Sequence, residues 1–329
     1  MRKKLFGILI ILLLFTLTGC GRYTPGKITR DLDKKIGNLK AYRLSGVLEI
    51  TNNDDVYNYD VDVSYKTNDK YKVVLKNKAN KHEQIILKND DGVYVLTPAL
   101  NKSFKFQSDW PYNTSQIYLL EAILDDIKGD KKKKLFKEKK QYVLQTKVNY
   151  TNNKKLVKQN IFLDKHLNIK KIDVFDKNEV PLMQMTFKRI DYSPTFKDSY
   201  FKLPKAFNTK KAKTTSKIED VIYPLVIPAN TKLVSEEKID KTNGERVLMT
   251  FEGDKPFLLV EETANVEDEL TVVPTYGEPY MFADTIGVMA DNSLTWNSSG
   301  MEYYLVSDVM GKEELLEIAK SINVIPTMK

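Results

Sequence analysis

Cysteine and histidine are almost absent from the chain, which has 329 residues. Its single cysteine is Cys20, and its two histidines, His82 and His166, both stand beside predicted turns. One cysteine excludes an intramolecular disulfide, and two distant histidines argue against a zinc site. The sequence also lacks the phosphate loop, the dinucleotide fingerprint, the nucleophile elbow and the zinc-protease helix motif. We therefore expect no metal, no other bound cofactor and no enzymatic activity.

Long hydrophobic runs are missing everywhere except at the start. Met1–Lys4 is basic, Leu5–Leu17 is almost entirely apolar, and small residues precede Cys20. This order is typical of a secretory signal peptide. The run is shorter than the ~20 residues that a membrane-spanning helix needs. We predict a signal peptide over residues 1–19, cleavage before Cys20 and export of the remaining chain.

The four residues Leu17-Thr18-Gly19-Cys20 resemble the lipobox of bacterial lipoproteins. The resemblance implies that the sulfur of Cys20 receives a diacylglycerol and that Cys20 becomes the N-terminus. Two acyl chains hold a protein on a membrane stably, whereas one holds it only marginally. We predict an acyl anchor such as palmitate on Cys20, a tether over residues 20–27 and a position on the extracytoplasmic face of the cell membrane. An ordinary signal peptide with a chance cysteine is the alternative.

Charges of both signs are abundant, with 52 lysines and arginines against 44 aspartates and glutamates. This balance excludes a polybasic nucleic-acid binder, and we expect no nucleic-acid partner. The densest cluster consists of Lys131 to Lys134 with Lys137, Lys139 and Lys140. It fits either a solvated loop or a contact with anionic lipid or polymer.

Alternation of apolar and polar residues indicates strands with one buried face, and it is clearest between residues 57 and 66. The apolar positions there are Tyr57, Tyr59, Val61, Val63 and Tyr65. Similar segments separated by turns continue to about residue 192. Helical spacing predicts helices over about 29–39, capped by Thr29, and from Asn113 or Thr114 to Lys128. Strands joined by short turns predict a curved antiparallel sheet with helices against one face.

A change in composition predicts two domains. Residues 206–218 are rich in lysine, threonine and serine and read as a linker. The first domain is predicted over residues 28–205. The second is predicted over residues 219–329 as a small α+β domain, in which strands precede a final helix.

The stretch Asp91–Lys102, with Asp-Gly, a strand, a proline and a turn, resembles a hairpin of the lipoprotein-localisation carrier superfamily. Phe201-x-Leu203-Pro204 is similar to the end of that family's domain. The resemblance covers about residues 26–205. It implies an unclosed antiparallel β-barrel whose apolar hollow, covered by helices, can hold acyl chains or a partner's hydrophobic segment. The candidate cavity lining is then the inward face formed by Tyr57, Tyr59, Val61, Val63 and Tyr65.

The whole chain is similar to the two-domain sporulation- and germination-associated lipoproteins of spore-forming Firmicutes. The C-terminal stretches that carry this resemblance are Tyr223-Pro224, Leu294-x-Trp296, Gly300-x-x-Tyr303-Tyr304 and Glu313–Ala319. The expected fold class is mainly β with α: an unclosed β-barrel plus a small C-terminal α+β domain.

Two functions follow as hypotheses. The first is a non-enzymatic, membrane-anchored envelope lipoprotein that binds a lipidic group or a hydrophobic protein segment in sporulation or germination. The alternative is a scaffold or regulator that positions a cell-wall-modifying enzyme, with a purely structural hollow. An open apolar cavity would favour the first, and a hollow packed with the chain's own side chains beside an exposed apolar patch would favour the second.

Overall fold

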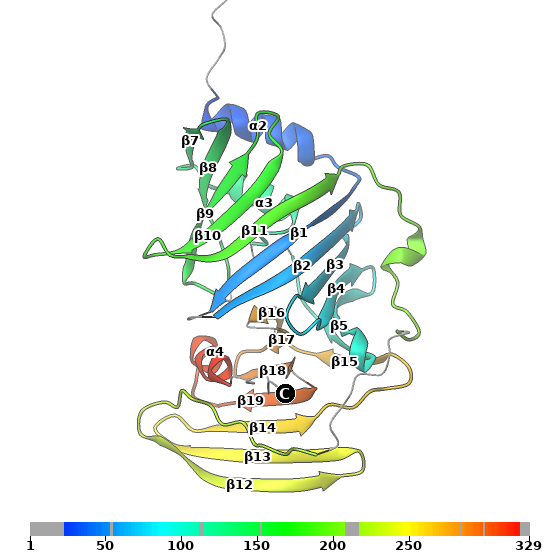
Figure 1. Cartoon of the computed structure of the whole chain (residues 1–329), viewed down its shortest axis with the longest axis vertical. Coiled ribbons are helices and arrows are strands. Elements are labelled where there is room, and N and C mark those ends of the chain that lie inside the picture. The colour runs from blue at the N-terminus through cyan, green and yellow to red at the C-terminus, as the bar shows by residue number, and fades with distance from the viewer. Residues whose placement is uncertain are drawn as a thin grey trace, which may run out of the picture.

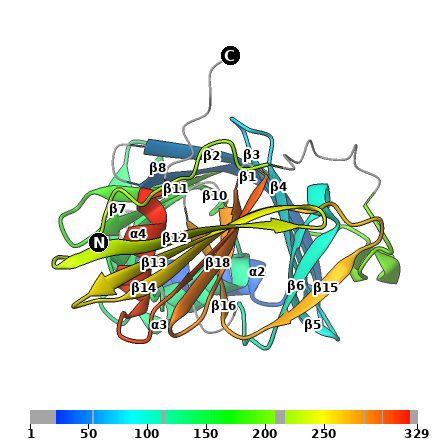
Figure 2. The ribbon, with the colours of Figure 1, turned by 90° about the horizontal axis from the view of Figure 1, so that it is seen from below.

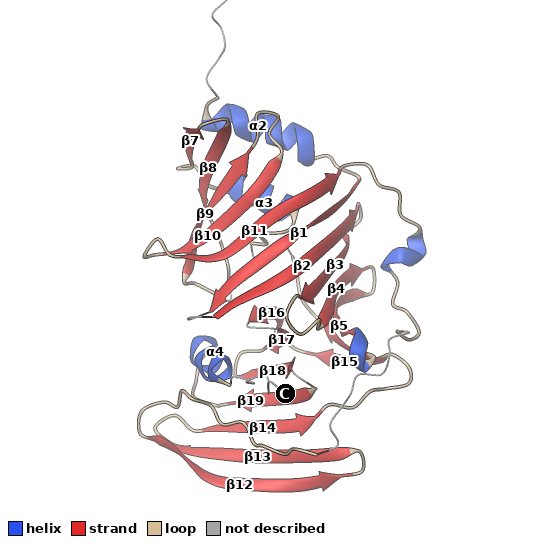
Figure 3. Ribbon diagram, viewed as in Figure 1, coloured by secondary structure: helices blue, strands red, loops and turns tan. Residues whose placement is uncertain are grey.

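The computed structural model describes residues 23–52, 55–111, 115–151, 153–207, 217–282, 285–298 and 300–322. The predicted signal peptide and Cys20 lie outside this part of the chain, so both stay predictions. Figures 1 and 3 show two β-sheets, one above the other along the long axis, with helices packed against them. No helix in the described ranges is both long enough and apolar enough to cross a membrane.

The first sheet has twelve strands among the described residues, in the order β15-β6-β5-β4-β3-β2-β1-β11-β10-β9-β8-β7. Its strands are β1 (Ala41–Asn52), β2 (Asp55–Lys66), β3 (Lys70–Asn77), β4 (Glu83–Asn89), β5 (Gly92–Thr97), β6 (Lys102–Phe106), β7 (Lys134–Glu138), β8 (Gln141–Lys147), β9 (Leu156–Leu163), β10 (Ile169–Asp176), β11 (Pro181–Asp191) and β15 (Thr271–Thr275). Neighbouring strands are antiparallel, except that β15 runs parallel to β6. Two meanders, β1 to β6 and β7 to β11, therefore join where β1 pairs with β11.

Helices α2 (Pro25–Ile36) and α3 (Leu120–Gly129) cover the inner, concave face of this sheet (Figure 1). Helix α2 buries Leu32, and α3 buries Ile123, in the same cluster as the inward side chains of β1 and β2. The amphipathic spacing of both helices accounts for this placement, because only one stripe of each helix is apolar.

Both helices differ in their limits from the prediction. The hydroxyl of Thr24 accepts a hydrogen bond from the Lys27 N–H (3.2 Å), which makes Thr24 the N-cap instead of Thr29. Pro25 starts the helix without cost, since an amide at the first position has no helical partner. Helix α3 begins at Leu120, later than expected, and the caps predicted at Asn113 and Thr114 lie outside the described residues.

The second sheet has seven strands within the described ranges, in the order β12-β13-β14-β19-β18-β17-β16. They are β12 (Thr231–Lys241), β13 (Gly244–Gly253), β14 (Phe257–Thr263), β16 (Glu278–Phe282), β17 (Thr285–Met289), β18 (Ser293–Ser298) and β19 (Met301–Val306). Helix α4 (Lys312–Ser321) packs on one face through Leu315 and Ile318. All neighbouring strands are antiparallel.

The expected fold class is confirmed: the chain is mainly β, with an unclosed antiparallel sheet covered by helices and a smaller C-terminal α+β part. Two features differ from the predicted organisation. Strand β15 lies in the range assigned to the second domain, yet it extends the first sheet beside β6 (Figure 2). The lysine-rich stretch, for which a solvated loop was one of two interpretations, contains the edge strand β7.

Candidate functional site

The hollow of the first sheet is the place where the resemblance predicts a ligand, and its inward side chains are packed together. Tyr59, Val61 and Val63 are at most 3% exposed and belong to one continuous apolar cluster with the inner faces of α2 and α3. Tyr57 and Tyr65 are partly buried against the same cluster. The five predicted lining residues thus share the inward face of β2, but they contact other side chains of the core.

A hairpin from the other sheet completes the filling. Ile286 and Val288 of β17, both 4% exposed, belong to the core of the first sheet, and Met281 of β16 packs against it. The hairpin formed by β16 and β17 therefore closes the open side of the hollow. Figure 1 shows these two strands directly below the first sheet, at the top of the second.

A single glutamine links the hairpin to the first sheet. Gln84 on β4 is 3% exposed. Its Nε2 donates to the carbonyl of Ile286 (3.0 Å), and its Oε1 accepts from the Ile286 N–H (2.6 Å) and from the Thr285 hydroxyl (3.2 Å). The side-chain amide acts here as one more peptide group, which satisfies backbone polar atoms that water cannot reach.

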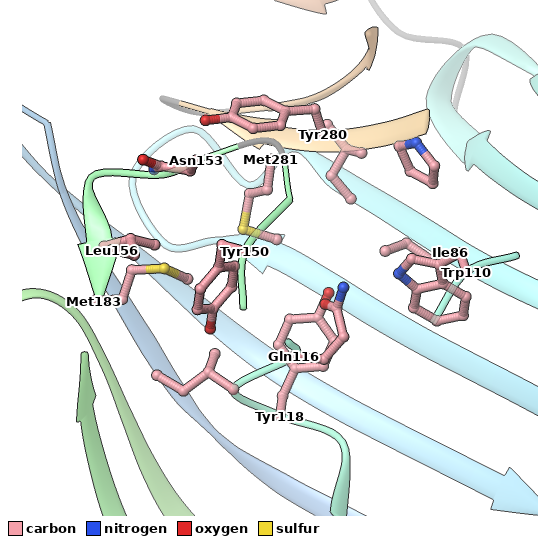
Figure 4. Close-up of a pocket in the computed structure, with 13 residues that line it drawn as sticks. Ile86, Trp110, Gln116, Tyr118, Tyr150, Asn153, Leu156, Met183, Tyr280 and Met281 are labelled. Atoms are coloured by element: carbon pink, nitrogen blue, oxygen red, sulfur yellow. The ribbon is translucent and has the colours of Figure 1, made fainter. Parts of the chain in front are cut away.

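A small cavity of about 90 Å³ remains between the hairpin and the hollow. Figure 4 shows Tyr280 and Met281 on one side of it, with Tyr118 and Tyr150 on the other. Its lining contains none of the five predicted residues and comprises Ile86, Trp110, Gln116, Ile117, Tyr118, Tyr150, Asn153, Leu156, Met183, Pro279, Tyr280, Met281 and Ile286. Burial raises the pKa of the Tyr118 and Tyr150 hydroxyls, so the lining is uncharged at neutral pH.

Sequence reasoning missed this cavity for a physical reason. Its walls come from segments that are distant in the chain, and no local spacing marks them. The one local signal is Trp110, a large aromatic residue just after a strand, which the structure buries to 2% exposure. The other tryptophan, Trp296, stacks on Tyr303 at 4.9 Å between ring centroids and belongs to the core of the second sheet.

A larger groove, of about 790 Å³, lies on the opposite, outer face of the first sheet. It runs between β1, β11 and the segment 194–200, and charged side chains line it together with Tyr200. Asp62 faces Arg43 at 3.7 Å, and Asp60 faces Lys188 at 3.4 Å, with exposed side chains throughout. Asp60 and Asp62 therefore lie on the solvated face of β2, opposite the apolar positions that the alternation over residues 57–66 predicts to be buried.

An exposed apolar segment lies at the second sheet. Tyr223, Leu225, Val226 and Ile227 are 46%, 77%, 47% and 40% exposed. Their backbone is fixed by helix α4, because the Val226 N–H donates to the Ser321 hydroxyl (3.0 Å) and the Leu225 N–H to the Ser321 carbonyl (3.5 Å).

Acidic and histidine side chains do not form a metal site in the part of the chain that the structure describes. No group of three or more His, Cys, Asp or Glu residues is arranged to hold an ion there. His166 lies in the turn before β10, where Asp164 caps the backbone N–H of His166 and Asn168. The expectation that the protein uses no cofactor stays a prediction.

The comparisons with known proteins place the chain beside a sporulation protein. No protein-family profile matches it. It is 35% identical to the sporulation protein YdcC of Bacillus subtilis (strain 168), over 97% of this chain and 97% of that protein.

Two solved structures are similar in outline only. A LolA superfamily protein, NE2245 from Nitrosomonas europaea, has 11% identity and a TM-score of 0.26, over 88% of this chain and 94% of that chain. A chain of the CwlD amidase–GerS lipoprotein complex from Clostridioides difficile has 20% identity and a TM-score of 0.24, over 52% of this chain and 98% of that chain. TM-scores this low fix neither a ligand nor a partner for the present chain.

Proposed function

The chain belongs to the family of the sporulation protein YdcC, and we propose that it serves sporulation as a membrane-anchored, non-enzymatic envelope protein that binds a protein partner. The observation that carries this proposal is the filled hollow of the first sheet. Of the two functions expected from the sequence, it favours the scaffold or regulator over the lipid binder.

A lipid carrier needs an empty apolar space, and ligand pockets typically measure ~300–1,000 Å³. The space between the hollow and the hairpin is about 90 Å³. An acyl chain would have to displace the β16–β17 hairpin and break the hydrogen bonds between Gln84 and Ile286. This cost supports a structural role for the hollow.

The partner-binding surface that we propose is the apolar segment Tyr223–Ile227. Exposed apolar residues that cluster on a fixed backbone are typical of protein interfaces. Because Ser321 already orders Leu225 and Val226, binding there loses little conformational entropy. The proposed partner is an envelope protein with a complementary apolar surface, and a cell-wall-modifying enzyme is the narrower hypothesis.

Two single substitutions with matched exposure test this surface. Val226→Asp places a charge on the segment, and Val180→Asp places one on the β10–β11 turn, where the valine is 46% exposed against 47% for Val226. Loss of an interface hot spot weakens binding more than about tenfold. We expect Val226→Asp to reduce the yield of heat-resistant spores at unchanged protein level. It should also reduce the yield of crosslinks to the partner from a photo-reactive amino acid placed at position 225. Equal results for both variants would contradict the proposal.

Attachment through Cys20 completes the proposed function. Replacement of Cys20 with alanine should release the protein from the membrane fraction, because the thiol that accepts the diacylglycerol is gone. Membrane fractionation after an alkaline wash measures this release. Continued tight association of the Cys20→Ala protein with the membrane would contradict the proposed lipid anchor.

Lipid binding is the second candidate, and the uncharged lining of the remaining cavity favours it. Mass spectrometry of lipids extracted from the purified, anchored protein separates the two functions. The partner-binding proposal expects no lipid in the extract, because the lipid on Cys20 is covalent and stays with the protein. An extracted lipid in equal amount to the protein would support the carrier instead.

A further inference from the structure

The lysine strand, defined as residues 131–140, is the most strongly charged surface segment of the protein. It contains seven lysines and one glutamate, and strand β7 forms its centre. Six of the lysines are exposed, and Lys133, which is partly buried, donates to the Asp130 carbonyl (2.9 Å). β7 is an edge strand of the first sheet, so one side of the segment faces away from the fold.

These lysines lack the partners that neutralise most other lysines of the sheet. Lys158, Lys170, Lys171 and Lys188 all form ion pairs with aspartate or glutamate side chains. Within the described ranges, no ion pair involves any of the seven lysines of the lysine strand. Their charge is therefore available to an external anion. Repulsion between lysines this close raises the free energy of the unbound protein, and an anionic partner would remove this repulsion.

An exposed aromatic residue lies in the middle of this charge. Phe136 is 46% exposed, opposite the buried Val143 in the register of β7 and β8. A free anionic polymer in water gains little from a phenylalanine. A lipid interface favours an exposed phenylalanine, because the ring can enter the acyl boundary while the lysines remain among the head groups.

The start of the described chain lies beside the lysine strand. The ring of Tyr23 contacts that of Tyr142 at 5.0 Å between centroids, and Tyr142 pairs with Lys137 across β7 and β8. Cys20 precedes Tyr23 by three residues, and an extended chain covers at most ~3.6 Å per residue. The backbone of Cys20 therefore lies within about 11 Å of the backbone of Tyr23, so a lipid on Cys20 brings the bilayer surface close to the lysine strand.

We propose that the lysine strand docks on the anionic lipid surface that holds the Cys20 anchor, with Phe136 at the acyl boundary. This inference rests on the lipid anchor of the proposed function and adds an orientation to it. The second sheet lies at the opposite end of the long axis from β7 and α2 (Figure 1). Docking therefore points the apolar segment Tyr223–Ile227 away from the membrane, toward a partner.

The single cysteine makes a direct test possible. Because Cys20 carries the lipid, a cysteine introduced at another position can be labelled alone. We would place an environment-sensitive fluorophore at Phe136→Cys and, as a control of similar exposure, at Val234→Cys on β12 (46% and 43% exposed). The full lipidated protein is reconstituted into vesicles of phosphatidylcholine, with or without phosphatidylglycerol, that contain nitroxide-labelled lipid.

We expect strong quenching at position 136 and little at position 234, only in vesicles that contain phosphatidylglycerol. The changes Lys131→Gln, Lys132→Gln, Lys139→Gln and Lys140→Gln together should reduce quenching at 136 to the level at 234. Their exposed side chains can change without loss of the fold, which the thermal unfolding midpoint checks.

Flotation of the vesicles separates the two hypotheses. Protein that fails to float contradicts the anchor itself. Protein that floats while position 136 stays as accessible to aqueous iodide as position 234 contradicts only the docking. Protection of the label by a soluble anionic wall polymer, with none by phosphatidylglycerol, would assign the lysine strand to the polymer and overturn the inference.

Discussion

The two sheets bury their apolar faces in different ways. The first covers its concave face with two helices, α2 and α3, whose backbone N–H groups bond within each helix after the first turn. The second uses helix α4 and an extended segment, and that segment needs acceptors from outside. The Ile218 N–H donates to Glu245 (2.6 Å), and the Ile222 N–H donates to Glu261 (3.0 Å). Buried carboxylates of the second sheet thus replace the hydrogen bonds that a helix makes by itself.

The sheets also depend on each other. The first receives the β16–β17 hairpin in its hollow and gains β15 at its edge, where the Thr271 N–H donates to the Asn101 carbonyl (2.8 Å). Two sheets that share segments in this way lose contacts together. We therefore expect one cooperative unfolding transition for the whole protein.

The largest expected effect comes from a core leucine in either sheet. Leu32 on α2 and Leu315 on α4 are both 0% exposed. Leu32→Ala and Leu315→Ala should each lower the free energy of unfolding by about 2–5 kcal/mol, because each leaves a cavity. Chemical denaturation followed by tryptophan fluorescence reports both halves, with Trp110 in the first core and Trp296 in the second.

The shape of the transition decides whether the sheets are coupled. A single shifted transition in both variants supports the shared strand β15 and the shared β16–β17 hairpin as the basis of the coupling. If Leu315→Ala melts the second sheet alone, while Trp110 reports an unchanged first sheet, the two sheets are independent.

The sequence predicted the elements whose pattern is local. Alternation marked β2 and β3, and amphipathic spacing marked α2 and α4, because each buries one face only. Strand β7 was not predicted, because lysines occupy both of its faces and its polarity does not alternate. Strand β15 was not predicted, because its residues are all partly or fully exposed at a sheet edge and show no buried face.

The candidate site was less predictable than the fold. Alternation shows which face of β2 points inward, but not what fills the space in front of it. The contact between Gln84 and Ile286 joins residues separated by 202 positions, and neither residue stands in a recognisable motif. Whether a curved sheet holds a ligand or its own hairpin is therefore a property of long-range packing, which one sequence does not display.

The next effect concerns two carboxyls, that of Glu121 at the first sheet, which is partly exposed, and that of Glu261 in the second, which is 1% exposed. Burial raises the pKa of Glu121 to about 7, although the Tyr42 hydroxyl donates to it at 2.8 Å. Burial also raises the pKa of Glu261 in the second sheet. A raised carboxyl pKa stabilises the folded state below the unfolded pKa of ~4.3, and this stabilisation disappears as the pH rises through the folded pKa.

We therefore expect the free energy of unfolding to fall between pH 5 and pH 8, by at most about 3 kcal/mol from Glu121. Glu121→Gln keeps an acceptor for Tyr42 and should remove the larger part of this fall, leaving the part due to Asp126, whose pKa burial raises to about 6, and to Glu261. Urea denaturation at both pH values measures the difference. An unchanged pH dependence in Glu121→Gln would mean that the first sheet does not hold this carboxyl in its protonated form.

The smallest expected effect tests the link between the sheets. Gln84→Leu keeps the volume but leaves the Ile286 N–H and carbonyl buried without partners, which costs about 1–3 kcal/mol. Gln145→Leu is the control, because Gln145 lies in the same sheet and its side chain bonds, among the residues that the structure describes, only to the side chain of Asn160 (3.0 Å). Denaturation gives the two costs, and hydrogen exchange at Ile286 shows whether the hairpin opens.

The combination of the two measurements bears on function. If Gln84→Leu speeds exchange at Ile286 while both sheets stay folded, the hairpin can leave the hollow without loss of the second core. The anchored variant should then take up lipid that the wild-type protein excludes, since departure of Ile286 and Val288 uncovers the apolar face behind them. If the costs of Gln84→Leu and Gln145→Leu are equal and exchange is unchanged, the hairpin is held by apolar packing alone, and the hollow is closed whatever the state of Gln84.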